Sequence, residues 1–212
     1  MKLGLPSRLY AIVDAEAGGD ELVRRTEGLL RGGARLLQLR WKRTGAAAFL
    51  AVASECGRLA AAYGARLFIN DRVDVALACG ADGVHLGQSD LPLATARRLL
   101  GPVRWIGIST HDVEQARVAA AGGADYVGFG PIFATSTKRT GYSPRGLEEL
   151  RRVRAAVTLP VVAIGGIDFD NAPEVIAAGA DAVAMISALK AWPDPAEAAR
   201  VVLDRLATDR SP

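Results

Sequence analysis

The chain has 212 residues, a mass of 22.2 kDa and a formal net charge of +3, and half of its residues are hydrophobic. This length suits one well-buried domain, and the apolar content with charges of both signs argues against intrinsic disorder. No stretch approaches the ~20 apolar residues of a membrane span, and the first residues lack the features of a secretory signal. We therefore expect a globular protein without a membrane segment.

The cysteines indicate the redox environment of the protein, and the basic residues indicate the kind of ligand that it binds. Cys56 and Cys79 lie in helix-like segments without metal-site spacing, which favours a reduced, cytoplasmic setting. The 26 basic residues are spread over nearly every helix-like segment, so the sequence does not indicate a nucleic-acid partner. A small positive excess suits acidic small molecules.

A short pattern recurs along the chain, in which a glycine and an alanine stand directly before an apolar run. Its glycines are Gly33, Gly80, Gly123 and Gly179, and each fits the position after a helix end where φ is positive. The copies are spaced at about two strand–helix units of ~25 residues, and another apolar run lies midway in each interval. With one run before the first copy, the predicted strands are 9–13, 36–39, 67–69, 84–86, 105–108, 126–129, 161–164 and 183–186.

The segments that follow these strands have the periodicity of amphipathic helices. In chain order they are 21–31, 46–63, 73–79, 93–100, 113–121, 147–155, 171–178 and 195–206. Asp112 and Asp170 stand where helix N-caps are expected. The strands are almost continuously apolar, which is typical of a parallel sheet buried on both faces.

Eight strands, each followed by a helix, predict an α/β fold of the (β/α)8 TIM barrel type, a single compact domain over residues 1–212. The alternative is an open doubly wound sheet, but residues 15–19 lack the glycine-rich turn that usually follows its first strand. Residues 1–7 and 208–212 are expected to fray. The catalytic groups of such a barrel lie at the carboxyl ends of its strands.

Polar residues gather at the ends of the second, third and fourth predicted strands. Gln38, Arg40 and Lys42 alternate toward one side, where they suit a ligand with several negative charges; a solvated strand edge is the alternative. Asp71 and Asp90 follow the next two strands and match a Mg²⁺ site completed by water and phosphate, although each also suits a helix cap. The sequence has no cysteine and histidine spacing typical of zinc.

The later strand ends add hydroxyl groups and glycines. The sixth strand leads into a long loop that suits an anion-binding lid, with Thr135, Ser136, Thr137 and Lys138. Gly165–Gly166 and Ile186–Ser187 follow the last two strands, where such barrels bind a phosphate monoester through backbone N–H groups; two ordinary turns are the alternative. A diphosphate site beside a monophosphate site predicts transfer of a carbon group with release of diphosphate.

Seven motifs, in this order, resemble the thiamine-phosphate synthase family and cover nearly the whole predicted barrel. They are QLRWK at 38–42, FINDR at 68–72, DGVHLGQSD at 82–90, GISTH at 107–111, GFGPIFATSTK at 128–138, AIGGI at 163–167 and MIS at 185–187. The resemblance implies a transferase that joins 4-amino-2-methyl-5-(diphosphooxymethyl)pyrimidine to 4-methyl-5-(2-phosphooxyethyl)thiazole, with Mg²⁺ as cofactor and thiamine phosphate and diphosphate as products. The implied partners are small phosphorylated substrates, and homo-oligomerisation stays open.

The resemblance also implies the role of each site residue. Mg²⁺ is held by Asp71 and Asp90. The pyrimidine diphosphate is held by Gln38, Leu39, Arg40, Trp41, Lys42, Asn70, Ser109 and Lys138, and the catalytic residues are Arg40, Lys42, Ser109 and Lys138. The thiazole phosphate is held by Thr135, Ser136, Thr137, Gly166, Ile186 and Ser187. The family mechanism is dissociative: diphosphate leaves first, and the thiazole nitrogen then captures a pyrimidine methylene cation, so no strong general base is needed.

One residue departs from the family, and two alternative functions stay open. Trp41 stands where the family usually has an acidic residue; because it alternates away from Arg40 and Lys42, we expect a changed local contact and retained chemistry. A TenI-like thiazole tautomerase has the same barrel, needs neither Mg²⁺ nor diphosphate, and would use His111 as a proton carrier. The other alternative is a barrel that binds a phosphorylated ligand without catalysis. The pair of carboxylates favours the synthase.

Overall fold

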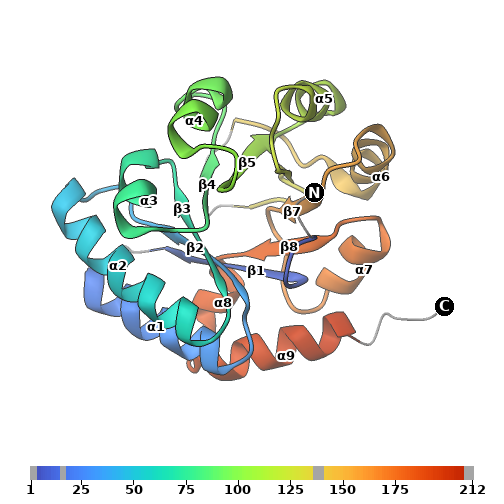
Figure 1. Cartoon of the computed structure of the whole chain (residues 1–212). Helices are drawn as coiled ribbons and strands as arrows, with labels where there is room; N and C mark the ends of the chain where they lie inside the picture. Colours follow the sequence, from blue (N-terminus) through green and yellow to red (C-terminus); the bar gives the residue numbers. More distant parts are fainter. Residues whose placement is uncertain (1–3, 15–17, 136–140, 208–212) are drawn as a thin grey trace.

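The computed structural model describes residues 4–14, 18–135 and 141–207. Its eight strands are all parallel, pair in sequence order and close into a barrel where β1 meets β8 (Figure 1). They are β1 (Leu9–Asp14), β2 (Leu36–Arg40), β3 (Arg66–Asn70), β4 (Gly83–Leu86), β5 (Trp105–Thr110), β6 (Tyr126–Phe129), β7 (Val161–Ile164) and β8 (Ala182–Met185). The predicted (β/α)8 barrel is confirmed, and the open doubly wound sheet is excluded.

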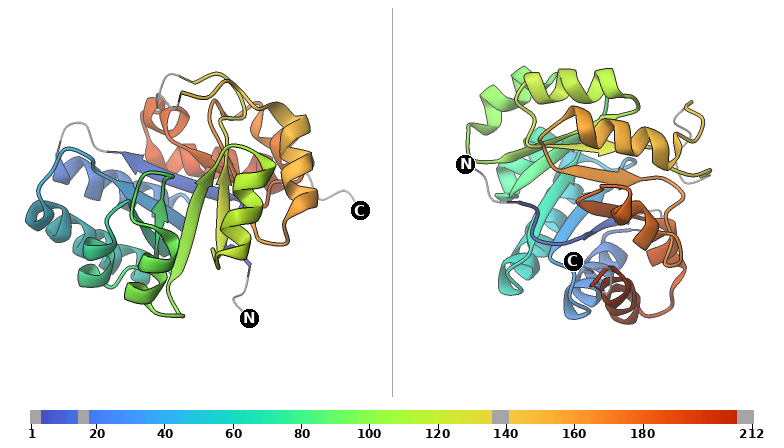
Figure 2. Two further views of the ribbon diagram at one scale, coloured as in Figure 1. Left: turned by 90° about the horizontal axis from the view of Figure 1, so that it is seen from above. Right: turned by 90° about the vertical axis from the view of Figure 1, so that its right-hand side faces the viewer.

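The helices surround the strands, as the two further views in Figure 2 show. They are α1 (Gly19–Arg31), α2 (Ala46–Ala62), α3 (Val73–Cys79), α4 (Leu93–Leu100), α5 (Val113–Ala121), α6 (Gly146–Ala156), α7 (Ala172–Ala177), α8 (Ser187–Ala191) and α9 (Pro195–Ala207). Each helix expected from the sequence is present, with its ends shifted by no more than two residues. The structure adds one helix, α8, which the sequence did not predict because five residues are too few to show helical periodicity.

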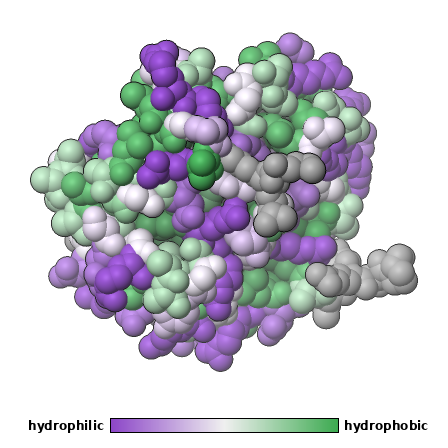
Figure 3. Space-filling model, in the orientation of Figure 1, coloured by the Kyte–Doolittle hydropathy of each residue, from purple (hydrophilic) through white to green (hydrophobic). Residues whose placement is uncertain are grey.

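The surface mixes hydrophilic and hydrophobic residues on the face shown in Figure 3. Within the described ranges, no helix combines the length and the apolar character that crossing a bilayer requires.

The recurring glycine–alanine pairs end helices, as the sequence predicts. Gly33, Gly80, Gly123 and Gly179 have φ between 71° and 106°, a region that glycine enters without steric cost. In each copy the N–H of the following alanine donates to the carbonyl five residues earlier. This is the hydrogen bond of the Schellman motif, which turns the chain from a helix directly into the next strand.

An aspartate follows the glycine–alanine pair in three of the four copies, and it joins the start of its own strand to the preceding strand. The carboxylate accepts a backbone N–H of the preceding strand, and the aspartate's own N–H donates to the carbonyl of that same residue. The pairs are Asp82 with Leu67, Asp125 with Ile106, and Asp181 with Val161. These contacts set the pairing register near the amino ends of the strands, opposite the end where the site lies.

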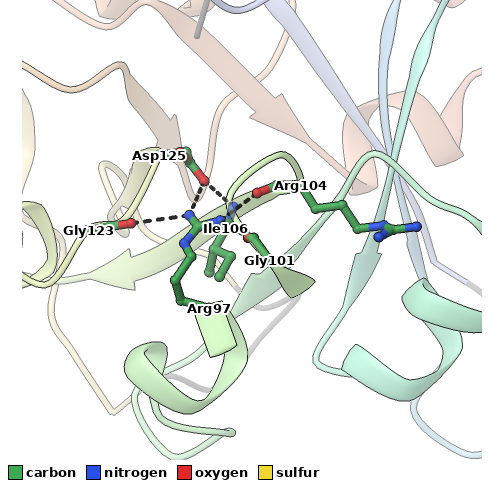
Figure 4. Close-up of polar contacts among 6 residues, drawn as sticks. All are labelled: Arg97, Gly101, Arg104, Ile106, Gly123 and Asp125. Atoms are coloured by element: carbon green, nitrogen blue, oxygen red, sulfur yellow. Dashed lines mark hydrogen bonds and ion pairs between the residues drawn. The ribbon is translucent and has the colours of Figure 1, made fainter. Parts of the chain in front are cut away.

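Arg97 of α4 adds a second set of bonds around one of these aspartates (Figure 4). Its guanidinium lies 2.5 Å from the carboxylate of Asp125. It also donates to the backbone carbonyls of Gly101, Arg104 and Gly123. One side chain thus satisfies carbonyls at the end of α4, before β5 and before β6, and both members of the ion pair are largely withdrawn from solvent.

We expect Asp125→Ala to lower the free energy of unfolding by about 2–3 kcal/mol, since it removes the acceptor of the Ile106 N–H and the ion-pair partner of Arg97, which keeps only its carbonyl acceptors. Urea denaturation followed by circular dichroism measures this change. Glu27→Ala, an exposed position on α1, is the control and should change stability by less than about 0.5 kcal/mol. Equal losses in the two variants would show that Asp125 does not stabilise the strand junction.

One of the two predicted N-caps is confirmed and the other is wrong. Asp112 caps α5 by accepting the N–H of Gln115 at 2.7 Å. Asp170 does not cap α7: Asp168 accepts the N–H groups of Asp170 and Asn171, and Pro173 in the first turn has no N–H to donate to an N-cap. Asp170 instead forms an ion pair with Arg205 of α9.

The inside of the barrel forms its own hydrophobic core, separate from the layer between strands and helices. Its members are Tyr10, Ile12, Leu36, Phe68, Trp105, Tyr126, Val162, Ala182 and Ala184. Tyr10, Val162 and Ala184 also line the cavity described below, so this core is the floor of that cavity.

Candidate active site

A cavity of about 990 Å³, its open mouth included, lies at the carboxyl ends of the strands. Its lining includes nine of the residues that the sequence nominated: Gln38, Arg40, Asn70, Asp71, Ser109, Thr135, Gly166, Ile186 and Ser187. These residues lie at or just after the ends of six different strands and meet only because the barrel closes. Ser136, Thr137 and Lys138 lie outside the described residues.

Asp71 follows β3 and lines this cavity, whereas its neighbours Asp90, which follows β4, and Lys42, which follows β2, are not among the lining residues. Asp90 is a close neighbour of Asp71, its Oδ2 accepts the N–H of Gly87 at 2.6 Å, and Lys42 Nζ lies 3.1 Å from Asp71 Oδ2. Burial and the neighbouring Asp90 raise the pKa of Asp71, while Lys42 opposes that shift. Two carboxyl groups in contact are unfavourable unless a proton or a cation lies between them.

Asp71 has an unusual backbone conformation, which two hydrogen bonds hold in place. Its φ of 62° is the only positive value at a non-glycine residue in the described part of the chain. The Asp71 N–H donates to the carbonyl of His85 at 2.9 Å, and the Arg72 N–H donates to the carbonyl of Asn70 at 2.7 Å, which closes a tight turn. Backbone strain of this kind persists where surrounding structure holds it, and it is concentrated at functional sites.

A third carboxylate, that of Asp14, holds Arg40, and the sequence motifs did not point to it. Asp14 is the last residue of β1, and its Oδ2 lies 2.5 Å from Arg40 Nη1 across the β1–β2 pair. Both side chains are mostly buried. The sequence signal for Asp14 was a lone carboxylate at the end of the first apolar run, and the structure places it opposite Arg40 in the β1–β2 pair. This ion pair keeps the guanidinium at the cavity wall.

A chain of hydrogen bonds crosses the floor of the cavity, and three of its residues were also missed. Gln38 Nε2 donates to the Tyr10 hydroxyl at 3.0 Å, and the hydroxyls of Tyr10 and Tyr126 are 2.9 Å apart. His85 joins Tyr126 to Ser109, with Nδ1 3.0 Å from the Tyr126 hydroxyl and Nε2 2.9 Å from Ser109 Oγ. Burial raises the pKa of both tyrosines, so both stay protonated.

Two glycines inside strands make room for these rings. A Cβ at Gly107 of β5 would lie 1.9 Å from the Tyr126 ring, and one at Gly128 of β6 would lie 2.7 Å from the His85 ring. Glycine inside a buried strand indicates close approach of another group, so these positions were the sequence signal for the missed residues.

Leu39 and Trp41 do not line the cavity, although the family resemblance implies that they contact the diphosphate. The Leu39 side chain is fully buried in the outer core. The Trp41 ring packs edge-on against Phe49 of α2, with 6.2 Å between ring centroids, and covers Gly19. Both side chains thus pack on the helix side of the sheet, and the Trp41 ring turns away from the cavity that Arg40 lines, as its alternation with Arg40 predicts.

The opposite side of the cavity consists of backbone from the last strands. Gly165 and Gly166 have φ of 101° and 65°, and a Cβ on either would lie 2.6 Å from the loop after β6. That loop is fixed to β7 by the N–H groups of Ile132 and Phe133. Thr135, Ile186 and Ser187 line the same cavity, and Ser187 is the first residue of α8. The arrangement offers neutral backbone donors where the sequence predicts a monophosphate.

His111, the proton carrier of the tautomerase alternative, also lines the cavity. Its Nδ1 donates to the carbonyl of Gly130, and its ring stacks on Tyr142 with centroids 3.8 Å apart. These contacts hold the ring against the loop after β6.

Comparison with known proteins identifies the family of this chain. A family model described as thiamine monophosphate synthase matches residues 9–189. A putative thiamine-phosphate synthase of Geobacter sulfurreducens is 49% identical over 196 residues, 92% of each chain, and a thiamine-phosphate synthase of Moorella thermoacetica is 48% identical over 196 residues, 91% of this chain and 92% of the relative. The solved thiamine phosphate pyrophosphorylase of Pyrococcus furiosus superposes with a TM-score of 0.87 at 36% identity, covering 96% of this chain and 97% of that one. The chain therefore belongs to the thiamine monophosphate synthase family, as its motifs predict.

Proposed function

We propose that this thiamine-phosphate synthase joins the pyrimidine diphosphate to the thiazole phosphate inside the barrel mouth, by a Mg²⁺-assisted dissociative reaction. The observation that carries the proposal is the contact between Asp71 and Asp90 beside Lys42, on the side of the cavity opposite the glycine turn of β7. One side suits a metal-bound diphosphate, and the other suits a monophosphate.

The donor set fits Mg²⁺. Asp71 and Asp90 would hold it; burial and the neighbouring Asp90 raise the pKa of Asp71, and a divalent ion beside both carboxylates would oppose that rise. The described residues contain no cluster of three or more histidines, cysteines or carboxylates, so a bound ion would keep positions for water and diphosphate oxygens. Bound Mg²⁺ would neutralise negative charge that develops on the departing diphosphate.

Arg40 and Lys42 would bind the diphosphate directly, together with Lys138. Arg40 is held by Asp14, and Lys42 by Asp71, so both cations are positioned before the substrate arrives. Positive charge that needs no rearrangement lowers the barrier to diphosphate departure. Asn70 lines the same wall, while Leu39 and Trp41 would contribute backbone groups.

The pyrimidine ring would lie over the floor. Gln38 donates its amide N–H to Tyr10, so its amide oxygen remains as the acceptor for the amino group of the ring. Ser109 would donate its hydroxyl to the reacting substrate. Because the nucleophile is a ring nitrogen, the site needs no general base.

The thiazole phosphate would bind at the ends of β7 and β8. Gly166, Ile186 and Ser187 offer backbone N–H groups there, and Thr135 adds a hydroxyl, with Ser136 and Thr137 following in the loop. A cytoplasmic location and homo-oligomerisation stay predictions from the sequence.

We expect Ser187→Ala to change the KM for the thiazole phosphate less than about threefold, since the expected contact is the backbone N–H. Steady-state kinetics at saturating pyrimidine diphosphate measures it. A tenfold rise in KM would show that the Ser187 hydroxyl itself binds the phosphate.

The proposal is tested by incubating the purified chain with both phosphorylated rings and Mg²⁺ and measuring thiamine phosphate by chromatography. Parallel reactions omit the metal or the pyrimidine diphosphate. The synthase requires all three components. A change of the thiazole phosphate alone, without metal, would instead support the tautomerase, and binding without turnover would support the non-catalytic barrel.

A further inference from the structure

The hydrogen-bond chain beneath the cavity has a direction. Tyr10 and Tyr126 are 1% and 0% exposed, so their hydroxyl protons need acceptors within the protein. Since Gln38 Nε2 can only donate, Tyr10 accepts that bond and directs its own proton to Tyr126. Tyr126 then donates to His85 Nδ1, which places the imidazole proton on Nε2.

This direction determines what Ser109 can do. His85 Nε2–H donates to Ser109 Oγ, so the serine oxygen accepts from below and its own proton turns toward the cavity. The Ser109 backbone is held as well, because Gln88 Nε2 donates to its carbonyl oxygen. The reverse direction would leave the buried Tyr10 proton without an acceptor and would turn the Ser109 proton toward His85.

We propose that Tyr126 and His85 are positioning residues that keep the Ser109 hydroxyl as a donor to the reacting substrate. The inference rests on the proposed role of Ser109 and adds two residues to it: His85, which lines the cavity, and Tyr126, which lies in the core beneath it. The five strands involved, β2, β1, β6, β4 and β5, include pairs that are not neighbours in the sheet, so the hydrogen-bond chain runs across the barrel interior. The missing Cβ atoms at Gly107 and Gly128 keep the space that both rings need.

Tyr126→Phe removes the donor to His85 and keeps the ring. We expect a roughly tenfold lower kcat with KM for the thiazole phosphate unchanged, and an approximately hundredfold lower kcat for Ser109→Ala. In the Ser109→Ala background, Tyr126→Phe should change kcat less than twofold, because the group that it positions is gone. A merely structural role would lower kcat by the same factor in both backgrounds.

Thr26→Val is the matched control. Like Tyr126→Phe it removes a fully buried hydroxyl, but Thr26 is hydrogen-bonded to Cys56 and does not line the cavity. Its kcat should stay at the wild-type value even if its Tm falls as far as that of Tyr126→Phe. Equal factors in the two Ser109 backgrounds, or an unchanged kcat in Tyr126→Phe, would overturn the positioning role. Unchanged kcat in Ser109→Ala would overturn the proposed role of Ser109 itself, whereas a wild-type chain that forms no thiamine phosphate would overturn the proposed function.

Discussion

Asp71→Asn should lower kcat about a thousandfold while the barrel still folds. The substitution keeps the shape of the side chain but removes one of the two carboxylates that would hold Mg²⁺. It also removes the ion pair with Lys42. Because burial and Asp90 raise the pKa of Asp71, its charged form is unfavourable in the folded chain, so the variant should have an equal or higher Tm at neutral pH. That gain should shrink as the pH falls toward the usual carboxyl range, where the wild-type group is protonated as well.

Steady-state kinetics across Mg²⁺ concentrations and thermal denaturation measure the two effects. Asp74→Asn is the matched control: it lies three residues away on α3, is largely exposed and pairs with Arg72. Its kcat should stay within twofold of wild type. Wild-type turnover in Asp71→Asn at saturating Mg²⁺ would contradict a metal site at the ends of β3 and β4.

Arg40→Ala should lower kcat/KM for the pyrimidine diphosphate by a factor of about 10²–10³. The loss has two parts, because the variant removes a cation from the cavity wall and leaves the mostly buried Asp14 without its partner. Arg40→Lys should recover only part of the activity, since an ammonium group provides charge but not the planar donor geometry of a guanidinium. The KM for the thiazole phosphate should stay unchanged.

Varying one substrate at a time separates these effects. Arg72→Ala is the control for net charge, because Arg72 is more exposed and pairs with Asp74 on α3. A similar loss of kcat/KM in Arg72→Ala would show a long-range charge effect. If Arg40→Ala lowered kcat/KM only for the thiazole phosphate, Arg40 would bind that substrate and not the pyrimidine diphosphate.

Local signals in the sequence predicted the fold well. Each glycine–alanine pair predicts a helix end because the positive φ and the hydrogen bond to the residue five positions earlier involve only one turn of chain. Continuous apolar runs predict parallel strands for the same reason, since a strand buried on both faces needs apolar side chains at every position. The short helix α8 was missed because five residues show no helical periodicity, and the cap of α7 was predicted wrongly because Asp168, not Asp170, accepts the N–H groups at the start of that helix.

The sequence by itself determined which residues stand at the carboxyl ends of the strands, because strand order and side-chain alternation are properties of the chain. It therefore nominated Asp71, Asp90 and Arg40 without three-dimensional information. Only the tertiary structure decided which of these groups touch and what lies beneath them. Tyr10 and Tyr126 are indistinguishable from ordinary core aromatics until the barrel closes and brings β1 and β6 together across its interior, where buried hydroxyls must find partners.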